Sequence, residues 1–314
     1  MLEKIINDIN YRLYDHNLTA EVIHKNGGYE GDIIIPEIVV FNEATYRVTS
    51  IASWAFRGCQ SLTSITIPDS VTSIGGGAFE NCDSLEQKPT QQIEIDELTY
   101  QLLMHNHQAE LILYTGDAET VAIPSEITFE GVSYRVTSIS YNVFEYCGYL
   151  YTIFIPESVT SIDSAIECCF NLHQIVVAEG NTVYDSRENC NAIIETATNT
   201  LIRGCENSTI PDSVTSIGYR AFADCSWRES IVIPDGVTSI RDEAFDGCKE
   251  LTSIIIPNSV ESIGDGAFHD CWSLTDITFQ GTIAQWEKIE LYNDWDADVP
   301  ATVVHCTDGD VEID

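Results

Sequence analysis

The chain has 314 residues, 44% of them hydrophobic, and its 50 acidic against 14 basic side chains give a formal net charge of −36. Such a surface repels nucleic-acid phosphates, which argues against direct nucleic-acid binding. The negative charge is then explained either by solubility or by a preference for basic partners. No segment approaches the roughly 18 apolar residues of a membrane-spanning helix, and the N-terminal MLEKIINDIN lacks the apolar region of a secretion signal.

Residues 1–47 are predicted to form an N-terminal β cap. The stretch YRLYDHNLTAEV from Tyr11 matches YQLLMHNHQAEL from Tyr100, so residues 96–135 are expected to be a duplicate of that cap. Each copy contains an extra segment, VVFNEATYR and ITFEGVSYR, that alternates about a polar centre. We expect each of these two segments to fold as a hairpin.

A short repeat runs through most of the chain, and such periodicity indicates a stacked repeat fold. Its tetrapeptide V-[TE]-S-I recurs at spacings of 23 residues, interrupted by gaps of 65 and 55 residues. A pair such as Ala55–Phe56 follows, and a cysteine comes three residues after the pair. The tetrapeptides end at Ile51, Ile74, Ile139, Ile162, Ile217, Ile240 and Ile263, and the cysteines are Cys59, Cys82, Cys147, Cys169, Cys225, Cys248 and Cys271.

One repeat, LTSITIPDSVTSIGGGAFENC (62–82), shows how a unit is built. In LTSITIP the alternation turns Ile65 and Ile67 to one face and Ser64 and Thr66 to the other. The proline ends this strand, VTSI supplies a second one, and SIGGGAF makes a corner whose glycines other repeats replace freely. A lone unit cannot bury its apolar face, so the units are expected to stack at the strand spacing of about 4.8 Å.

An insertion separates Cys169 from Ile210. Within it, CNAIIETATNTLIRGC is predicted to fold about Thr196–Asn199, which places Ile193 opposite Ile202, Ile194 opposite Leu201, and Cys190 opposite Cys205. Facing cysteines form a disulfide in an oxidising compartment or remain buried thiols. We favour thiols, because the other cysteines are already assigned a structural position.

These motifs strongly resemble the leucine-rich repeat of the BspA type. The segments GNTVYDSRENCNAIIETATNTLIRGC (180–205) and GTIAQWEKIELYNDWDADVPATVVHCTDG (281–309) resemble an inserted segment and a closing segment of such proteins. The resemblance implies a β-rich leucine-rich-repeat solenoid with β-hairpin caps, and a binding protein on the cell surface or secreted. It implies no catalytic residues.

Three regions are expected. Residues 1–91 hold the N-terminal β cap and first repeats, residues 92–280 hold the duplicated cap and the main solenoid, and residues 281–314 close the C-terminal end. The region around Trp286 and Trp295 is the expected lid, since a repeat stack needs capped ends.

Catalytic and metal-binding readings are weak in this sequence. No hydrolase, metalloprotease, phosphate-loop or dinucleotide fingerprint occurs, and no cofactor is expected. The repeated cysteines are interpreted as small buried side chains. His105 and His107 lack an acidic third ligand, and the acidic stretches 293–300 and 306–314 lack a calcium-loop pattern. We therefore expect no catalytic, cofactor or metal site.

The outward side of the first strand is the expected partner-binding surface, because exposed apolar patches mark interaction sites and aromatic anchors carry much interface energy. Whether β-branched residues there bind a partner or simply suit a strand stays open. The candidate residues are Phe154, Val176, Val232 and Ile255 on the strands and Tyr149, Phe170, Trp227 and Trp272 near the corners.

The leading hypothesis is a non-enzymatic surface or secreted binding protein that holds a protein or glycan through this strand face. The alternative is an intracellular interaction scaffold, favoured by the missing signal and the many cysteines. An enzyme is the third and weakest hypothesis, since no nucleophile–base set or metal quartet is visible.

Overall fold

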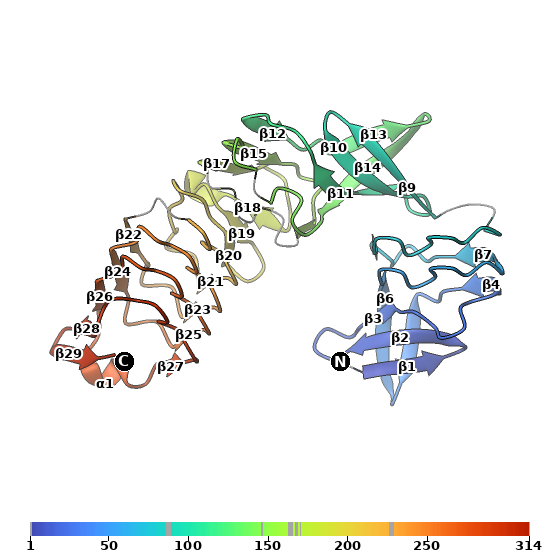
Figure 1. The fold of residues 1–314 in the computed structure, drawn as a ribbon. Helices are drawn as coiled ribbons and strands as arrows, with labels where there is room; N and C mark the ends of the chain where they lie inside the picture. Colours follow the sequence, from blue (N-terminus) through green and yellow to red (C-terminus); the bar gives the residue numbers. More distant parts are fainter. Residues whose placement is uncertain are drawn as a thin grey trace. The chain divides into compact units, whose positions relative to one another are not determined.

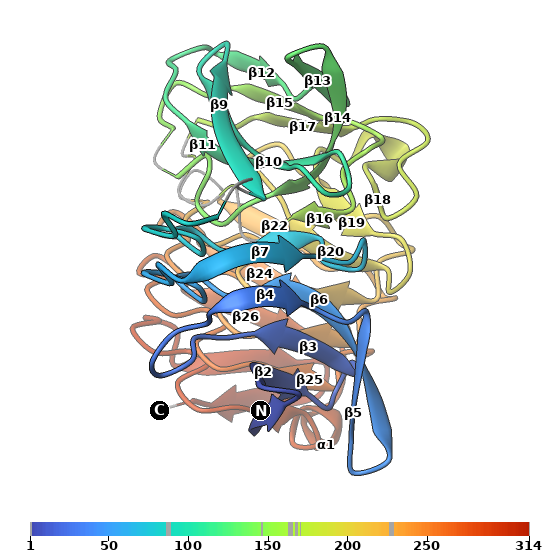
Figure 2. The same ribbon diagram turned by 90° about the vertical axis from the view of Figure 1, so that its right-hand side faces the viewer.

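A computed structural model describes residues 2–85, 89–145, 147–162, 166, 169, 171–225 and 229–313. These residues form a strand-rich fold with almost no helix (Figures 1 and 2). The chain divides into two compact units: unit 1 contains Met1–Ile112 and Glu126–Val136, and unit 2 contains Leu113–Ser125 and Thr137–Asp314. The expected three-region division, 1–91, 92–280 and 281–314, stays a prediction.

Two sheets share one topology, and they lie in the two stretches of the chain that match each other in sequence. In each sheet, three strands lie side by side in chain order, and a long strand that ends in the V-T-S-I tetrapeptide pairs with the third of them. The shorter strand that precedes the long strand in the chain pairs with it antiparallel. The predicted hairpins in VVFNEATYR and ITFEGVSYR are therefore present. The first sheet contains β1 (Leu2–Ile6), β2 (Ile9–Tyr14), β3 (Thr19–Val22), β5 (Ile38–Phe41) and β6 (Ala44–Ile51), and the second contains β9 (Thr90–Ile95), β10 (Leu98–Leu103), β11 (Gln108–Tyr114), β13 (Glu126–Phe129) and β14 (Val132–Ile139).

Most repeats contribute one strand to each of two ladders, which we call the IP ladder and the VTSI ladder, while the repeat that ends at Ile217 contributes a strand only to the VTSI ladder. Figure 1 shows the two ladders on opposite sides of the repeats. The IP ladder contains β4 (Gly31–Ile34) with β7 (Leu62–Thr66); β12 (Thr120–Ala122), β15 (Thr152–Ile155) and β17 (Gln174–Val177); and β22 (Ser230–Val232), β24 (Ser253–Ile256), β26 (Asp276–Phe279) and β28 (Val303–Cys306), with β29 (Gly309–Glu312) antiparallel at its end.

The VTSI ladder keeps the 23-residue spacing, since Ser216 pairs with Ser239 and Ser239 with Ser262. This register is why serine, threonine and isoleucine recur at fixed positions. It contains β8 (Ser73–Ile74) on β6, β16 (Ser161–Ile162) on β14, and the run β18 (Tyr184–Asp185), β19 (Ile193–Glu195), β20 (Thr200–Arg203), β21 (Ser216–Ile217), β23 (Ser239–Ile240), β25 (Ser262–Ile263) and β27 (Glu290–Leu291). The described helices are the 3-10 turn η1 (Arg187–Asn189) and α1 (Ile283–Trp286).

The core of unit 2 contains a column of aromatic rings. Phe222, Phe245 and Phe268 stack with ring centroids 5.4 and 5.3 Å apart and planes within 4° of parallel. All three are essentially buried. Because the three phenylalanines come from three successive repeats, the stacking ties these repeats to one another.

The repeated cysteines hydrogen-bond between repeats. The Cys248 thiol donates to the carbonyl of Phe222 over 3.2 Å, and the Cys271 thiol donates to that of Phe245 over 3.2 Å. Cys82 and Cys169 make the equivalent bonds to Phe56 and Phe144. The small side chain thus satisfies a buried carbonyl of the preceding repeat, which is a structural role.

The corner at Gly75–Gly77 tolerates substitution of its glycines less well than the sequence suggests. A Cβ at Gly75 would overlap the backbone of Ser53 in the preceding repeat, whereas one at Gly76 would meet nothing within 4 Å. We expect Gly75→Ala to lower the free energy of unfolding of unit 1 by about 1–3 kcal/mol, the usual cost of overpacking. Urea unfolding would measure this, with Gly76→Ala as the matched control. Equal stability of the two variants would contradict the prediction.

The inserted segment between Cys169 and Ile210 interrupts both ladders. Ser186 accepts a hydrogen bond from the backbone N–H of Val177, and the Cys190 carbonyl accepts one from Thr209. Residues of the insertion therefore make hydrogen bonds that an adjacent strand of the ladder would otherwise make. In the described chain, β17 and β22 lie in separate sheets, and so do β16 and β18.

The predicted hairpin in the insertion is present with a different register. Ile194 pairs with Leu201 as expected, but Ile193 pairs with Arg203 instead of Ile202, because a bulge lies between Ile193 and Ile194. Cys190 and Cys205 are both buried, and no disulfide joins them. Each has its own acceptor, the Ala192 carbonyl at 3.8 Å and the Asn191 carbonyl at 3.3 Å respectively.

The C-terminal segment covers the last repeat with aromatic side chains. Trp286 lies 5.3 Å from Phe279 and 5.8 Å from Trp295, and Trp295 lies 6.0 Å from Phe268, all between ring centroids. Both tryptophans are buried. This is the arrangement expected of a lid. Among the described residues, no helix has the length and apolar character needed to cross a membrane.

Candidate functional site

The IP ladder presents two separate rows of outward side chains. In the first row, Ala122, Phe154 and Val176 are in register on β12, β15 and β17. Phe154 is 39% exposed and Val176 is half-buried. A cavity of about 280 Å³ lies against both side chains. Thr152, which the alternation places outward, is instead buried and donates to Gln174 over 3.4 Å.

The second row crosses β22, β24, β26 and β28. Val232, Ile255, Thr278 and His305 are in register there. Val232 is 62% exposed, while Ile255 is half-buried between its neighbours. Val232 also lines an open cleft of about 510 Å³ with Ile210 and Pro234. The row begins apolar and ends polar, so its apolar part is the pair Val232 and Ile255.

The exposure of Val232 has a structural cause, because β22 is an edge strand. The N–H of Ile233 donates to the Ile255 carbonyl, so by the alternation of a parallel ladder the peptide groups of Ser230 and Val232 point away from β24. No described residue pairs with them. An unpaired edge of this kind is open to another chain.

The corner aromatics lie apart from these rows. Tyr149 is 72% exposed and lines a cleft of about 590 Å³ with Tyr114 and Asp117. Trp272 is 56% exposed; its indole N–H donates to Asp270 over 3.1 Å, and the Lys249 ammonium lies 4.9 Å from its ring centroid. Trp227 and Phe170 lie outside the described residues.

A further cavity, of about 270 Å³, was not anticipated from the sequence. It opens on the VTSI side of unit 2, where the inserted segment interrupts the ladder between β16 and β18. Three arginines line it, Arg203, Arg220 and Arg241, together with Tyr184 and Tyr219. The signal available in the sequence was the presence of several arginines within residues 203–241 of a chain with only 14 basic residues.

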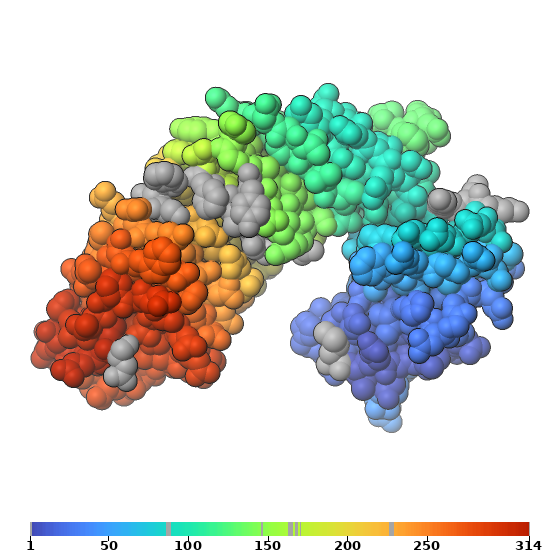
Figure 3. All heavy atoms as spheres, in the orientation of Figure 1, coloured from blue at the N-terminus to red at the C-terminus, as the bar shows by residue number. Residues whose placement is uncertain are grey.

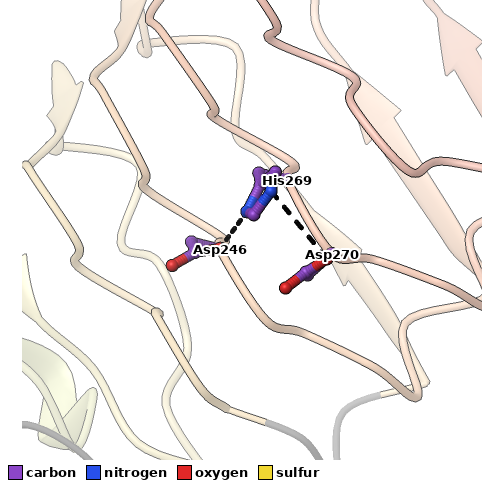
Figure 4. Close-up of side chains that lie close together, drawn as sticks. All are labelled: Asp246, His269 and Asp270. Carbon is purple, nitrogen blue, oxygen red and sulfur yellow. Dashed lines mark hydrogen bonds and ion pairs between the residues drawn. The ribbon is translucent and has the colours of Figure 1, made fainter.

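Asp246, His269 and Asp270 form the one cluster of metal-type ligands in the described residues, with ligand atoms within 4.8 Å of one another (Figure 4). His269 Nδ1 lies 2.8 Å from Asp246, and this hydrogen bond raises the pKa of His269. The other oxygen of Asp246 accepts from Arg220 over 3.2 Å. Since Asp246 is already held by two basic side chains, we interpret the cluster as an ion-pair network between repeats.

Comparison with known families decides the class of this chain. The sequence pattern described as the BspA type leucine-rich repeat region matches six copies, over residues 38–121, 114–194 and 198–294. This is well over half of the chain. The chain belongs to the BspA-type leucine-rich repeat family.

Solved structures of other leucine-rich repeat proteins are similar to this BspA-type chain. A leucine-rich cell surface protein of Faecalibacterium prausnitzii is 21% identical over 92% of this chain and 98% of its own, with a TM-score of 0.36. A leucine-rich repeat protein of Eubacterium ventriosum is 22% identical over 88% and 72%, with a TM-score of 0.42. The pneumococcal vaccine antigen PcpA is 14% identical over 90% and 82%, with a TM-score of 0.38. No curated protein matches the chain.

Proposed function

We propose that this BspA-type protein is a non-enzymatic binding protein that holds a protein or glycan partner on the outward face of its IP ladder. The observation that carries the proposal is the apolar pair Val232 and Ile255, in register on neighbouring strands and beside an open cleft. Partner binding would cover this apolar surface, and exposed apolar patches commonly have that purpose. Phe154 and Val176 form the second part of the proposed surface. Tyr149 and Trp272 at the corners are further proposed contacts, and so is Trp227, which lies outside the described residues.

Within each run of paired strands, the repeats are proposed to stack as a β solenoid with β-hairpin caps, since successive repeats there hydrogen-bond to one another through the ladders. Surface attachment or secretion is the location that family membership favours. The charge of −36 favours a partner with basic groups and disfavours nucleic acid.

A binding screen against extracellular matrix proteins, mucins and glycans would test the proposal, with the double variant Val232→Asp/Ile255→Asp. Two buried charges in an apolar contact should weaken binding of any hit by about tenfold or more. The matched control is Ile38→Asp/Val40→Asp, which makes the same changes at side chains 52% and 57% exposed on β5. The control should bind like the original protein.

Both variants must first melt like the original protein, because Ile255 is half-buried; Val232→Asp alone serves if the double variant does not. Binding that survives the Val232 change would move the site to the caps or corners. The absence of any extracellular hit would favour the intracellular scaffold.

A further inference from the structure

The cavity beside β20 is a product of the insertion. Ile193, Glu195 and Arg203 reach it from the inserted hairpin β19–β20, while Tyr219 and Arg241 reach it from the two following repeats. Tyr219 is 53% exposed. The cavity thus lies where the inserted hairpin β19–β20 stands beside the regular strand β21 in the VTSI ladder. Figure 1 shows this part of the ladder as a ribbon, and Figure 3 shows the same part of the chain, in yellow and orange, with all heavy atoms.

Two of the three arginines that line the cavity differ from most of the other described arginines, because they have no carboxylate partner. Arg12, Arg47, Arg57, Arg187 and Arg220 each form an ion pair with a carboxylate. Three described arginines pair with no described carboxylate: Arg135, Arg203 and Arg241. Two of these three line the cavity. The chain has 50 acidic residues and only 14 basic ones, so most arginines are expected to have a carboxylate partner. Two arginines without such a partner at one site are therefore unusual in this protein.

Arg203 is also incompletely hydrogen-bonded. Its side chain is partly buried, one terminal nitrogen donates to the Arg220 carbonyl over 2.9 Å, and its Nε is buried with no described acceptor. A buried cationic donor without an acceptor destabilises the fold unless something else pairs with it. A carboxylate in the cavity would supply that acceptor, since guanidinium and carboxylate groups pair through two parallel hydrogen bonds.

The rest of the lining indicates the kind of molecule that carries the carboxylate. Tyr219 and the isoleucines offer apolar surface, and Glu195 and Thr200 offer hydrogen-bond acceptors for hydroxyl groups. This combination suits a ring with one apolar face and several hydroxyls, and the volume of about 270 Å³ admits a ligand of that size.

We propose that this cavity binds an acidic sugar residue, with its carboxylate on Arg203 and Arg241 and its ring against Tyr219. The site is separate from the proposed strand-face surface, because it is lined by the other ladder and shares none of its residues. Either proposal can therefore fail without the other.

Titration calorimetry or protein NMR of the full chain with D-glucuronate would test this, with D-glucose as the uncharged counterpart. Glucuronate is expected to bind and glucose to bind at least tenfold more weakly. Arg203→Gln and Arg241→Gln should each weaken glucuronate binding about tenfold or more, which is the effect of losing a charged hydrogen-bond partner. Arg203→Lys should restore only part of the affinity, because a lysine cannot pair bidentately.

Arg135→Gln is the matched control, since it removes an arginine that likewise lacks a described carboxylate partner but belongs to unit 1 and does not line the cavity. It should leave binding unchanged. If Arg203→Gln unfolds the protein, the exposed Arg241 still provides the test. Equal binding of glucose and glucuronate, or unchanged binding in Arg241→Gln, would overturn the proposal. So would a peptide that binds through its free C-terminal carboxylate where glucuronate does not.

Discussion

Phe245→Ala is expected to lower the free energy of unfolding of unit 2 by about 3–5 kcal/mol, as removal of a buried aromatic side chain does. Phe245 is 1% exposed and stacks on Phe222 on one side and on Phe268 on the other. Its loss leaves a cavity in the middle of the column and removes both ring contacts. The repeats on either side lose their shared contact, so the destabilisation should spread beyond one repeat.

Denaturant unfolding followed by tryptophan fluorescence would measure this change. Phe154→Ala is the matched control, because the same atoms are removed from a side chain that is 39% exposed. It should cost about 1 kcal/mol or less, the usual effect of a surface substitution. Similar losses in the two variants would show that the column is not the main source of cohesion between repeats.

Trp286→Ala is expected to destabilise unit 2 by a similar amount, about 3–5 kcal/mol. Trp286 is 3% exposed, and its ring contacts both Phe279 of strand β26 and Trp295 of the closing segment. Without it, the apolar end of the stack is partly open to water. The variant should therefore also self-associate more readily, since an uncapped end of a repeat stack exposes apolar surface and lowers solubility.

Thermal melting and light scattering together would check both effects. Trp272→Ala is the appropriate control, because Trp272 is 56% exposed and lies at a corner. Removal of the Trp272 side chain should change the melting temperature little and should leave the light scattering equal to that of the original protein. A Trp286→Ala protein that melts like the Trp272→Ala protein would refute the lid role.

Much of the fold could be predicted because the repeat carries the same information many times. The 23-residue spacing predicts which residues pair in the VTSI ladder, and Ser216, Ser239 and Ser262 pair accordingly. The duplicated cap was equally accessible, since the matching stretches at Tyr11 and Tyr100 lie on equivalent strands, β2 and β10. In both cases several independent positions agree on one register.

The insertion shows where this reasoning stops. Hairpin formation about Thr196–Asn199 was predictable from turn residues, but the bulge at Ile193 was not, because a single extra residue is absorbed by local packing. The bulge brings Arg203 opposite Ile193 in place of Ile202. No local pattern indicated that an arginine would line a cavity there.

The candidate sites divide in the same way. Alternation along each strand predicted that Val232 and Ile255 face outward. Their very different exposures follow from neighbours distant in sequence: Val232 lies on an edge strand and Ile255 lies between two strands.

The sequence by itself determined the repeat unit, its register and the likeness of the two stretches that begin at Tyr11 and Tyr100, because each is written in several positions at a constant spacing. Only the tertiary structure decided where the ladders are interrupted, which strand edge is unpaired and which arginines share a cavity. Those features depend on how one irregular segment fills the space between regular repeats. That packing is a property of the assembled chain, since it joins residues with no common period.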